Sequence, residues 1–335
     1  MQKNLSLQKQ MITSIYIGGG TPSLLDIAQW DRLSRVLFKK IDLSCVREWS
    51  VECNPESFTI KKARMYADSG VTRLTFGIQS LSPRELSICG RIHSAQKALD
   101  TINDPRLGDW FNSIGVDLMY SLPGQTPESL DHTLTQVLSV SSIKHLSAYE
   151  LILYEHTPFG RHSRKLPLPS DEQSVAMYEL IGHRCSERGM KQYEISNYAL
   201  PGFESIHNKM YWSHKPYLGL GCSAHSYFHP RRWSNVSDVK TYISAISNQE
   251  SAMDFEEQIG PYEMAREMIF LGLRTKDGID ADSLYGKTGV ILDNDPRSGL
   301  LQHYLENGWL ERRDSKWIPT SKGLLFSDKM ARELI

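Results

Sequence analysis

Three consecutive glycines, Gly18 to Gly20, directly follow a short apolar run, Ser14–Ile17, and precede Thr21-Pro22. Glycine lets the backbone adopt positive φ and lets a ligand approach the peptide N–H groups closely. A strand, a bare-backbone turn and a helix beginning near Ser23 therefore form a geometry that can bind a polar ligand. The loop is not a Walker loop, because no Gly-Lys-Ser/Thr follows, and not a GxGxxG fingerprint, because Ser23 occupies the third position. Taken alone, such a loop is more often an ordinary tight turn between a strand and a helix than a ligand site.

Four polar residues follow or end successive predicted strands: Glu52, Gln79, Arg91 and Asp117. The carboxyl ends of parallel strands meet at one rim, which is where open sheets and barrels place their ligands. A single residue of this kind is readily explained as a cap or an exposed ion pair worth about 0–1 kcal/mol. Four of them at one rim, next to the glycine loop, favour a polar ligand that carries an amino acid or a ribose.

A segment from about residue 203 to 227 is dense in histidine, aromatic residues and glycine. Cys222-x-x-His225 could begin a zinc site, and His207 or His225 could be a haem axial ligand. Histidines hydrogen-bonded within loops are the simpler alternative. The segment also contains Gly219-x-Gly221-x-x-Ala224, a formal dinucleotide match, but the strand before it is poor and no acidic residue follows at the required distance. A Rossmann site is therefore not expected.

The first two thirds of the chain alternate strand-like and helical segments. Strands are predicted at residues 14–17, 49–53, 73–78, 114–119 and 146–151. Helix-start signals occur at Ser82-Pro83, Thr126-Pro127 and Ser170-Asp171, and Gly70 and Gly189 suit the left-handed position that ends a helix. Repeated units of this kind predict parallel strands joined by right-handed crossovers.

The pattern changes from about Phe255. Helices are predicted over 261–274 and 296–306, followed by two short strands around Asp314-Ser315 and a last helix after Thr320. This order is typical of a winged helix. Basic and acidic residues alternate within it, so DNA binding is not expected.

Composition limits the remaining function classes. The 335 residues include 38 Lys and Arg against 39 Asp and Glu, without a long basic block, so a nucleic-acid partner is not expected. The sequence has no apolar stretch of membrane-spanning length and no signal-peptide pattern, which predicts a cytoplasmic protein. Its five cysteines are scattered, as in reduced intracellular proteins, and no two form a CxxC pair. They are Cys45, Cys53, Cys89, Cys185 and Cys222.

Together, these segments resemble the oxygen-independent coproporphyrinogen III oxidase-like family of radical S-adenosylmethionine (SAM) proteins. The matching segments are residues 15–23, 52–56, 73–80, 90–93, 115–126 and 219–225. They occur in the family's order and spacing, and the resemblance covers essentially the whole chain. Within the family, His207-Asn-Lys-Met-Tyr-Trp212 is similar to the HNxxYW motif of the haem-chaperone branch, and residues 193–198 also look like that branch.

The resemblance implies an α/β fold with two domains. Residues 1–250 would form a partial parallel (β/α) barrel of the radical-SAM type with its first strand missing, carrying the haem-motif segment 203–227. Residues 255–335 would form the helical, winged-helix-like terminal domain. The implied function is to bind haem and hand it to acceptor proteins. The alternative is the oxidative decarboxylation of coproporphyrinogen III in porphyrin biosynthesis.

The resemblance also implies a SAM site and a haem site. The SAM contacts would be Gly19, Gly20, Thr21, Arg91, Gln79, Glu52, Asp117, Ile152 and His225. The glycine-loop backbone would meet the methionyl amino group, Arg91 would pair with the carboxylate, and Asp117 would bond the ribose. Ile152 and His225 would flank the adenosine, and Gln79 and Glu52 would add polar contacts. His207 would contact haem, with Tyr211 and Trp212 as apolar or stacking neighbours.

The sequence departs from the family at one point. The family places a CxxxCxxC loop before the glycine loop, and its three thiolates hold a [4Fe-4S] cluster. This sequence begins after that point, and the spacing of Cys45 and Cys53 is wrong for a substitute. We therefore expect an N-terminally truncated chain that does not ligate the cluster, and whether it is an enzyme stays open. Haem and haem-acceptor proteins are the expected partners, with peripheral membrane contact through acceptors and a homodimer as open alternatives.

Overall fold

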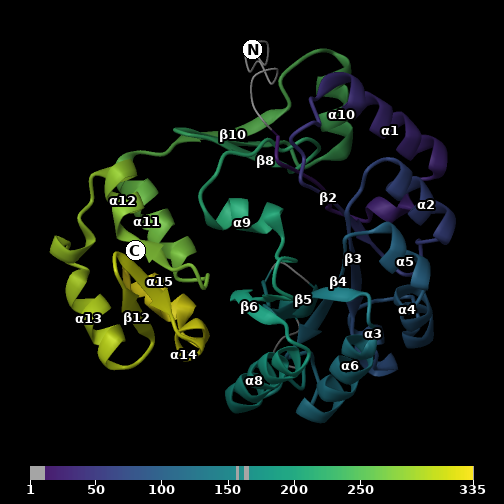
Figure 1. Ribbon diagram of the computed structural model, residues 1–335. Helices are drawn as coiled ribbons and strands as arrows, with labels where there is room; N and C mark the ends of the chain where they lie inside the picture. Colours follow the sequence, from purple (N-terminus) through teal and green to yellow (C-terminus); the bar gives the residue numbers. More distant parts are fainter. Residues whose placement is uncertain (1–11, 156–157, 162–165, 335) are drawn as a thin grey trace. The chain divides into compact units, whose positions relative to one another are not determined.

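The structure is a computed structural model that describes residues 12–155, 158–161 and 166–334 (Figure 1). The chain divides into two compact units, Gln10–His207 and Asn208–Ile335, called here the barrel unit and the C-terminal unit. The division falls earlier than the domain boundary expected near residue 250, so residues 208–250 group with the C-terminal residues. In the part of the chain that the structure describes, no helix combines the length and the apolar character needed to cross a membrane.

The barrel unit is built on a curled seven-stranded sheet with the order β1-β2-β3-β4-β5-β7-β6. Its strands are β1 (Ser14–Ile17), β2 (Glu48–Cys53), β3 (Arg73–Gln79), β4 (Ser113–Tyr120), β5 (Ile143–Glu150), β6 (Lys191–Glu194) and β7 (Asn197–Ala199). The first five strands pair in parallel, each with its neighbour in sequence, which confirms the predicted α/β half-barrel. The β6–β7 hairpin, which the sequence pattern did not predict, is antiparallel and pairs with β5 through β7.

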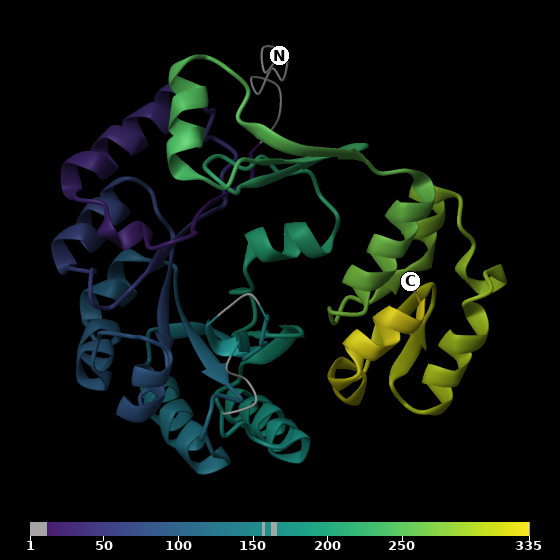
Figure 2. The same ribbon diagram turned by 180° about the vertical axis from the view of Figure 1, so that it is seen from behind.

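Helices cover the outer side of this sheet (Figures 1 and 2). They are α1 (Ile27–Lys40), α2 (Ile60–Asp68), α3 (Pro83–Ile88), α4 (Ala95–Ile102), α5 (Pro105–Trp110), α6 (Pro127–Ser139) and α8 (Asp171–Glu187), with a 3-10 turn at Pro22–Leu24. A four-residue helix, α7 (Pro158–Arg161), lies in the connection between β5 and α8. Helices α3, α6 and α8 begin at the predicted start signals, and Thr126 and Ser170 close reciprocal capping boxes at α6 and α8. Gly70 and Gly189 have φ of 87° and 77°, the left-handed conformation predicted for them.

The core of the barrel unit lies between the sheet and its helices. Both faces of β3 and β4 are mostly buried, as expected for parallel strands covered by helices. Leu74, Phe76 and Ile78 of β3 are fully buried and belong to the same cluster as Trp30 of α1. This packing fixes the strands whose carboxyl ends carry the predicted site.

Helix α9 (Ile206–Trp212) spans the boundary between the units. It is followed by a three-stranded antiparallel sheet of order β10-β9-β8, formed by β8 (His225–Phe228), β9 (Arg231–Asn235) and β10 (Met253–Gln258), with α10 (Val239–Ser247) between the last two strands. The sequence pattern did not predict this sheet. Short strands rich in charged and aromatic residues have little of the apolar alternation that marks a strand.

The rest of the C-terminal unit has the predicted winged-helix-like order. Its elements are α11 (Pro261–Gly272), β11 (Ile279–Asp280), α12 (Ala281–Thr288), a 3-10 turn (Leu292–Asn294), α13 (Ser298–Glu306), β12 (Leu310–Arg313), β13 (Lys316–Pro319), α14 (Ser321–Leu325) and α15 (Ser327–Leu334). The predicted last helix is divided into α14 and α15. Leu301, Tyr304 and Trp317 are buried in a second hydrophobic cluster that belongs to this unit alone.

Candidate functional site

The glycine loop after β1 presents bare backbone. Gly19 and Gly20 have φ of 80° and 64°, and a Cβ added to either would meet nothing within 4 Å. At Gly18 the opposite holds, because an added Cβ would collide with the Tyr16 ring and the Glu52 carboxylate. Thr21 precedes the 3-10 turn without making a side-chain cap. The loop therefore combines open backbone at two glycines with a close side-chain approach that only glycine permits.

Glu52, near the end of β2, lies beside this loop. Its Oε2 accepts a hydrogen bond from the Gly19 N–H at 3.2 Å, and its Oε1 accepts one from the Tyr16 hydroxyl. Burial, and then the Glu52 carboxylate, raise the pKa of Tyr16 well above its ordinary value. Tyr16 therefore remains a protonated donor, and Glu52 holds both β1 and the glycine loop.

Gln79 ends β3 in an unusual conformation. Its φ is 69°, in the left-handed region that non-glycine residues seldom adopt, and the β3–β4 register shifts between Gly77 and Gln79. The Gln79 Nε2 and an Arg91 Nη lie 3.2 Å and 3.7 Å from the place that a Cβ on Gly77 would occupy. Gly77 thus leaves the space in which the amide and the guanidinium converge. Strain of this kind costs about 1–3 kcal/mol and is typical of ligand sites.

Asp117 lies in β4 between Gly77 of β3 and Ser147 of β5. Burial raises the pKa of Asp117 to about 7, and the negative charge of Glu52 contributes to the rise. The hydrogen bond from the Ser147 hydroxyl and the positive charge of Arg91 act in the opposite direction. A carboxyl group with this pKa is present in both protonation states near neutral pH. It can accept a hydrogen bond from a ligand hydroxyl or donate one to it.

The predicted SAM contacts therefore fall into two groups. The barrel unit collects seven of them around the carboxyl ends of β1 to β4: Gly19, Gly20, Thr21, Glu52, Gln79, Arg91 and Asp117. Ile152 follows β5 and is exposed, while His225 begins β8 in the C-terminal unit and is also exposed. Arg91 additionally lines a pocket of about 460 Å³ along the α3–α4 connection, together with Ile92 and His93.

His207 is held by residues of the barrel unit. Its Nδ1 lies 3.0 Å from the Ser14 Oγ, and its ring stacks on the Tyr16 ring with centroids 4.7 Å apart and planes inclined by 13°. Burial lowers the pKa of His207, although the Glu48 charge acts in the opposite direction. The imidazole is therefore neutral at neutral pH, which is the form that binds iron. Tyr211 and Trp212 follow on α9 beyond the unit boundary.

A buried ion pair that sequence reasoning missed anchors the segment before α9. Arg73 Nε and Glu48 Oε2 are 3.0 Å apart, and their side chains are only 6% and 5% exposed. Glu48 also accepts from the Ser205 hydroxyl at 3.1 Å and from the Ile206 and His207 N–H groups at 3.0 Å each. The signal was present, because Glu48 and Arg73 carry opposite charges and are the first residues of two neighbouring strands.

The donor set for metal ions is limited. Across residues 12–155, 158–161 and 166–334, no three His, Cys, Asp or Glu side chains gather in a way that could hold a metal ion. The five cysteines are free thiols. The Cys222 and His225 pair therefore has no third ligand within the described chain, and the residues present do not fit a [4Fe-4S] cluster.

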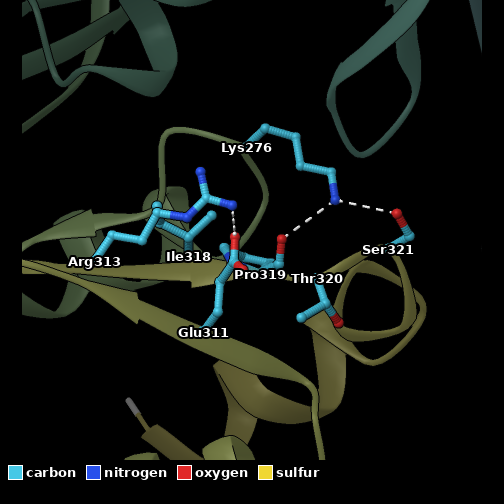
Figure 3. A pocket seen from close by; sticks show the side chains of 7 residues that line it. All are labelled: Lys276, Glu311, Arg313, Ile318, Pro319, Thr320 and Ser321. Carbon is cyan, nitrogen blue, oxygen red and sulfur yellow. Dashed lines mark hydrogen bonds and ion pairs between the residues drawn. The ribbon is translucent and has the colours of Figure 1, made fainter.

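The C-terminal unit contains a second pocket of about 400 Å³, lined by Lys276, Glu311, Arg313, Ile318, Pro319, Thr320 and Ser321 (Figure 3). The Lys276 Nζ donates to the Pro319 carbonyl at 3.3 Å and to the Ser321 Oγ at 3.4 Å. Arg313 pairs with Glu311 at 2.7 Å. Both cations are already engaged by protein groups: Lys276 joins the segment after α11 to the end of β13, and Arg313 pairs within β12.

Comparison with known proteins agrees with this geometry. The model of the radical SAM superfamily matches residues 2–137, and that of the HemN C-terminal domain matches residues 260–326. The solved coproporphyrinogen III oxidase (HemN) from Escherichia coli, a radical SAM enzyme, superposes with a TM-score of 0.82 at 22% identity. That match covers 96% of this chain and 77% of the oxidase, and it shows that the two share a fold.

Curated relatives are more similar in sequence. The heme chaperone HemW of Bacillus subtilis is 35% identical over 326 residues, covering 95% of this chain and 84% of the relative. The heme chaperone HemW of Lactococcus lactis is 34% identical over 284 residues, covering 84% of this chain and 74% of the relative. The chain therefore belongs to the HemW family of the radical SAM superfamily.

Proposed function

We propose that this protein is a haem chaperone that binds haem and SAM and delivers the haem to acceptor proteins. The observation that carries the proposal is the setting of His207, the first residue of the motif His207-Asn-Lys-Met-Tyr-Trp212. The names of the HemW relatives support the same function. The motif also favours the chaperone over the oxidase alternative, which shares the fold.

The surroundings of His207 suit a haem contact. A histidine that ligates iron is neutral and has its ring orientation set by a partner on the other nitrogen. Burial favours the neutral ring, the Ser14 hydroxyl lies at Nδ1, and the Tyr16 ring covers one face. Tyr211 and Trp212, one helical turn further along α9, would supply aromatic contact to the porphyrin.

The rim of the barrel unit fits SAM. Gly19 and Gly20 leave open backbone where a methionyl amino group could lie, with the Glu52 carboxylate beside it. Arg91 and Gln79 converge over Gly77, where a carboxylate could be bound. Asp117, with its pKa of about 7, would bond the ribose, and Ile152, which follows β5 in the same unit, would contact the adenosine.

In radical SAM proteins, SAM together with a [4Fe-4S] cluster would supply radical chemistry. The cysteines of this sequence do not fit that cluster, and no radical step is assigned to its residues. The role derived for the chain is to bind SAM at the rim and haem at His207. The expected partners are proteins that accept haem.

Haem titration of the purified protein, followed by visible absorption, tests the proposal. The wild type should give a saturable Soret shift. His207→Ala should weaken binding by about tenfold or more, since losing even a supporting group around a metal costs that much. His183→Ala removes an exposed histidine of α8 and should bind as the wild type does. A wild-type protein without a Soret shift, or a His207→Ala variant that binds normally, would overturn the haem proposal.

A further inference from the structure

Tyr16 makes contacts at both proposed sites. It lies in the middle of β1, and its side chain points to the same face of the strand as Ser14, because alternate residues share a face. Its ring stacks on His207, and its hydroxyl donates to Glu52. Both contacts lie within the barrel unit. One side chain therefore joins the histidine proposed for haem to the carboxylate proposed for SAM.

The contact between Tyr16 and His207 sets the orientation of the imidazole ring. Ser14 lies at Nδ1, and the Tyr16 ring is nearly parallel to the imidazole. Iron coordination uses a nitrogen lone pair in the plane of the imidazole, so a ring stacked on its face orients it without blocking that direction. The His207 N–H is bonded to Glu48 at 3.0 Å, so both the backbone and the ring of His207 are located by the first residues of β1 and β2.

The contact with Glu52 fixes where the tyrosine ring lies. Glu52 accepts from the Tyr16 hydroxyl through Oε1 and from the Gly19 N–H through Oε2. Gly18 leaves room for both side chains, which a Cβ there would displace. A hydrogen bond to a carboxylate is stronger than one between neutral groups, so its loss frees the ring to move.

We propose that Tyr16 is a positioning residue that couples the two sites: its hydrogen bond to Glu52 holds the tyrosine ring against His207 and thereby sets the affinity for haem. The inference rests on the proposed function, because it takes His207 as the haem contact.

A double-mutant cycle tests the coupling. Haem affinity is measured by Soret titration for the wild type, Tyr16→Phe, Glu52→Gln and the double variant, each checked for an unchanged far-ultraviolet circular dichroism spectrum. Tyr16→Phe keeps the ring and removes the hydroxyl. Each single variant should weaken haem binding about three- to tenfold, the scale of one net hydrogen bond, and the double variant should be no weaker than the singles. Singles that bind as the wild type does, or effects that multiply in the double variant, would overturn the coupling.

Tyr66→Phe is the matched control. The Tyr66 hydroxyl is buried in the same unit and has no hydrogen-bond partner among the described residues, so its removal should leave haem affinity unchanged.

A second readout separates this inference from the proposed function. The ring ¹⁵N resonances of His207, assigned by their loss in His207→Ala, are recorded without haem. They should shift in Tyr16→Phe and in Glu52→Gln but not in Tyr66→Phe. Unshifted resonances contradict the coupling whether or not haem binds, whereas shifted resonances in a protein that does not bind haem contradict only the proposed function.

Discussion

The carboxyl group of Asp117 shows how its neighbours tune one residue of the rim. Its pKa rises to about 7 chiefly because burial disfavours the charge, and Glu52 adds repulsion. In the unfolded chain the same group has a pKa near 3.8. The folded protein therefore holds a proton that the unfolded chain has released, and the stability associated with it is lost as the pH rises from about 4 to about 7.

Asp117→Asn should remove this pH dependence, because asparagine resembles the protonated carboxyl at every pH. One pKa unit corresponds to ~1.4 kcal/mol, and the partial exposure of Asp117 reduces the full effect. We expect the free energy of unfolding of the variant, relative to the wild type, to rise by about 1–2 kcal/mol between pH 5 and pH 8. Urea unfolding at the two pH values measures it. Asp109→Asn, at an exposed position of α5, is the control and should follow the wild type.

Sequence reasoning found the rim residues but not the residues that support His207. Glu52, Gln79 and Asp117 could be predicted because they are polar residues in the carboxyl-terminal halves of strands, where core packing does not explain them. Tyr16 could not, because an aromatic residue within a strand is ordinarily part of the core. Its contacts with Glu52 and His207 depend on the pairing of β1 with β2 and on a segment some 190 residues away in sequence.

Among the secondary-structure elements, the parallel strands and their helices were predictable, and the antiparallel pieces were not. The ends of the five predicted strands lie within three residues of those of β1 to β5, because turn signals bound the runs and β2 to β5 are mostly buried. β6 and β7 have four and three residues and owe their place to pairing with β5. Pairing between distant segments leaves no local pattern in so short a strand.

The segment that leads into α9 depends on the buried pair of Glu48 and Arg73. Glu48→Ala should lower the free energy of unfolding by about 3–5 kcal/mol, because it leaves the Arg73 guanidinium buried without its partner. Glu48→Ala should also speed hydrogen exchange of the Ile206 and His207 amides, because both N–H groups donate hydrogen bonds to the Glu48 carboxylate. Thermal unfolding and hydrogen exchange measure the two effects.

The matched control for Glu48 is Asp31→Ala, which breaks the exposed pair with Arg35 in α1. It should cost no more than about 0.5 kcal/mol, the usual worth of an exposed helical pair. Equal losses for the two variants would contradict the anchoring role of Glu48.

At the scale of the whole molecule, the two units have separate hydrophobic cores. Leu74 belongs to the cluster of the barrel unit and Leu301 to that of the C-terminal unit, and both are fully buried. The boundary at His207 places the first residue of the haem motif in one unit and the remainder in the other. The sequence pattern changes only near residue 255, well after this boundary. It shows the winged-helix-like order that begins there, but it gives no sign of the small sheet of β8, β9 and β10 before it.

Substitutions in the two cores should act locally. Leu74→Ala and Leu301→Ala should each lower stability by about 2–5 kcal/mol through lost burial and the cavity that remains. Hydrogen exchange followed by mass spectrometry should show faster exchange in β2 to β5 for the first and in α11 to α15 for the second. Faster exchange throughout both units in either variant would show instead that the cores unfold together.

The left-handed backbone of Gln79 has a consequence for anyone who wishes to make this protein more robust. Glycine in place of Gln79 would relieve the unfavourable φ of 69°. Selection for heat resistance alone would therefore favour the substitution Gln79→Gly. The same exchange would remove the amide that converges with Arg91 over Gly77. At this residue, thermal stability and ligand binding therefore favour different side chains. A library screened for stability alone would replace Gln79 and lose its amide from the proposed site.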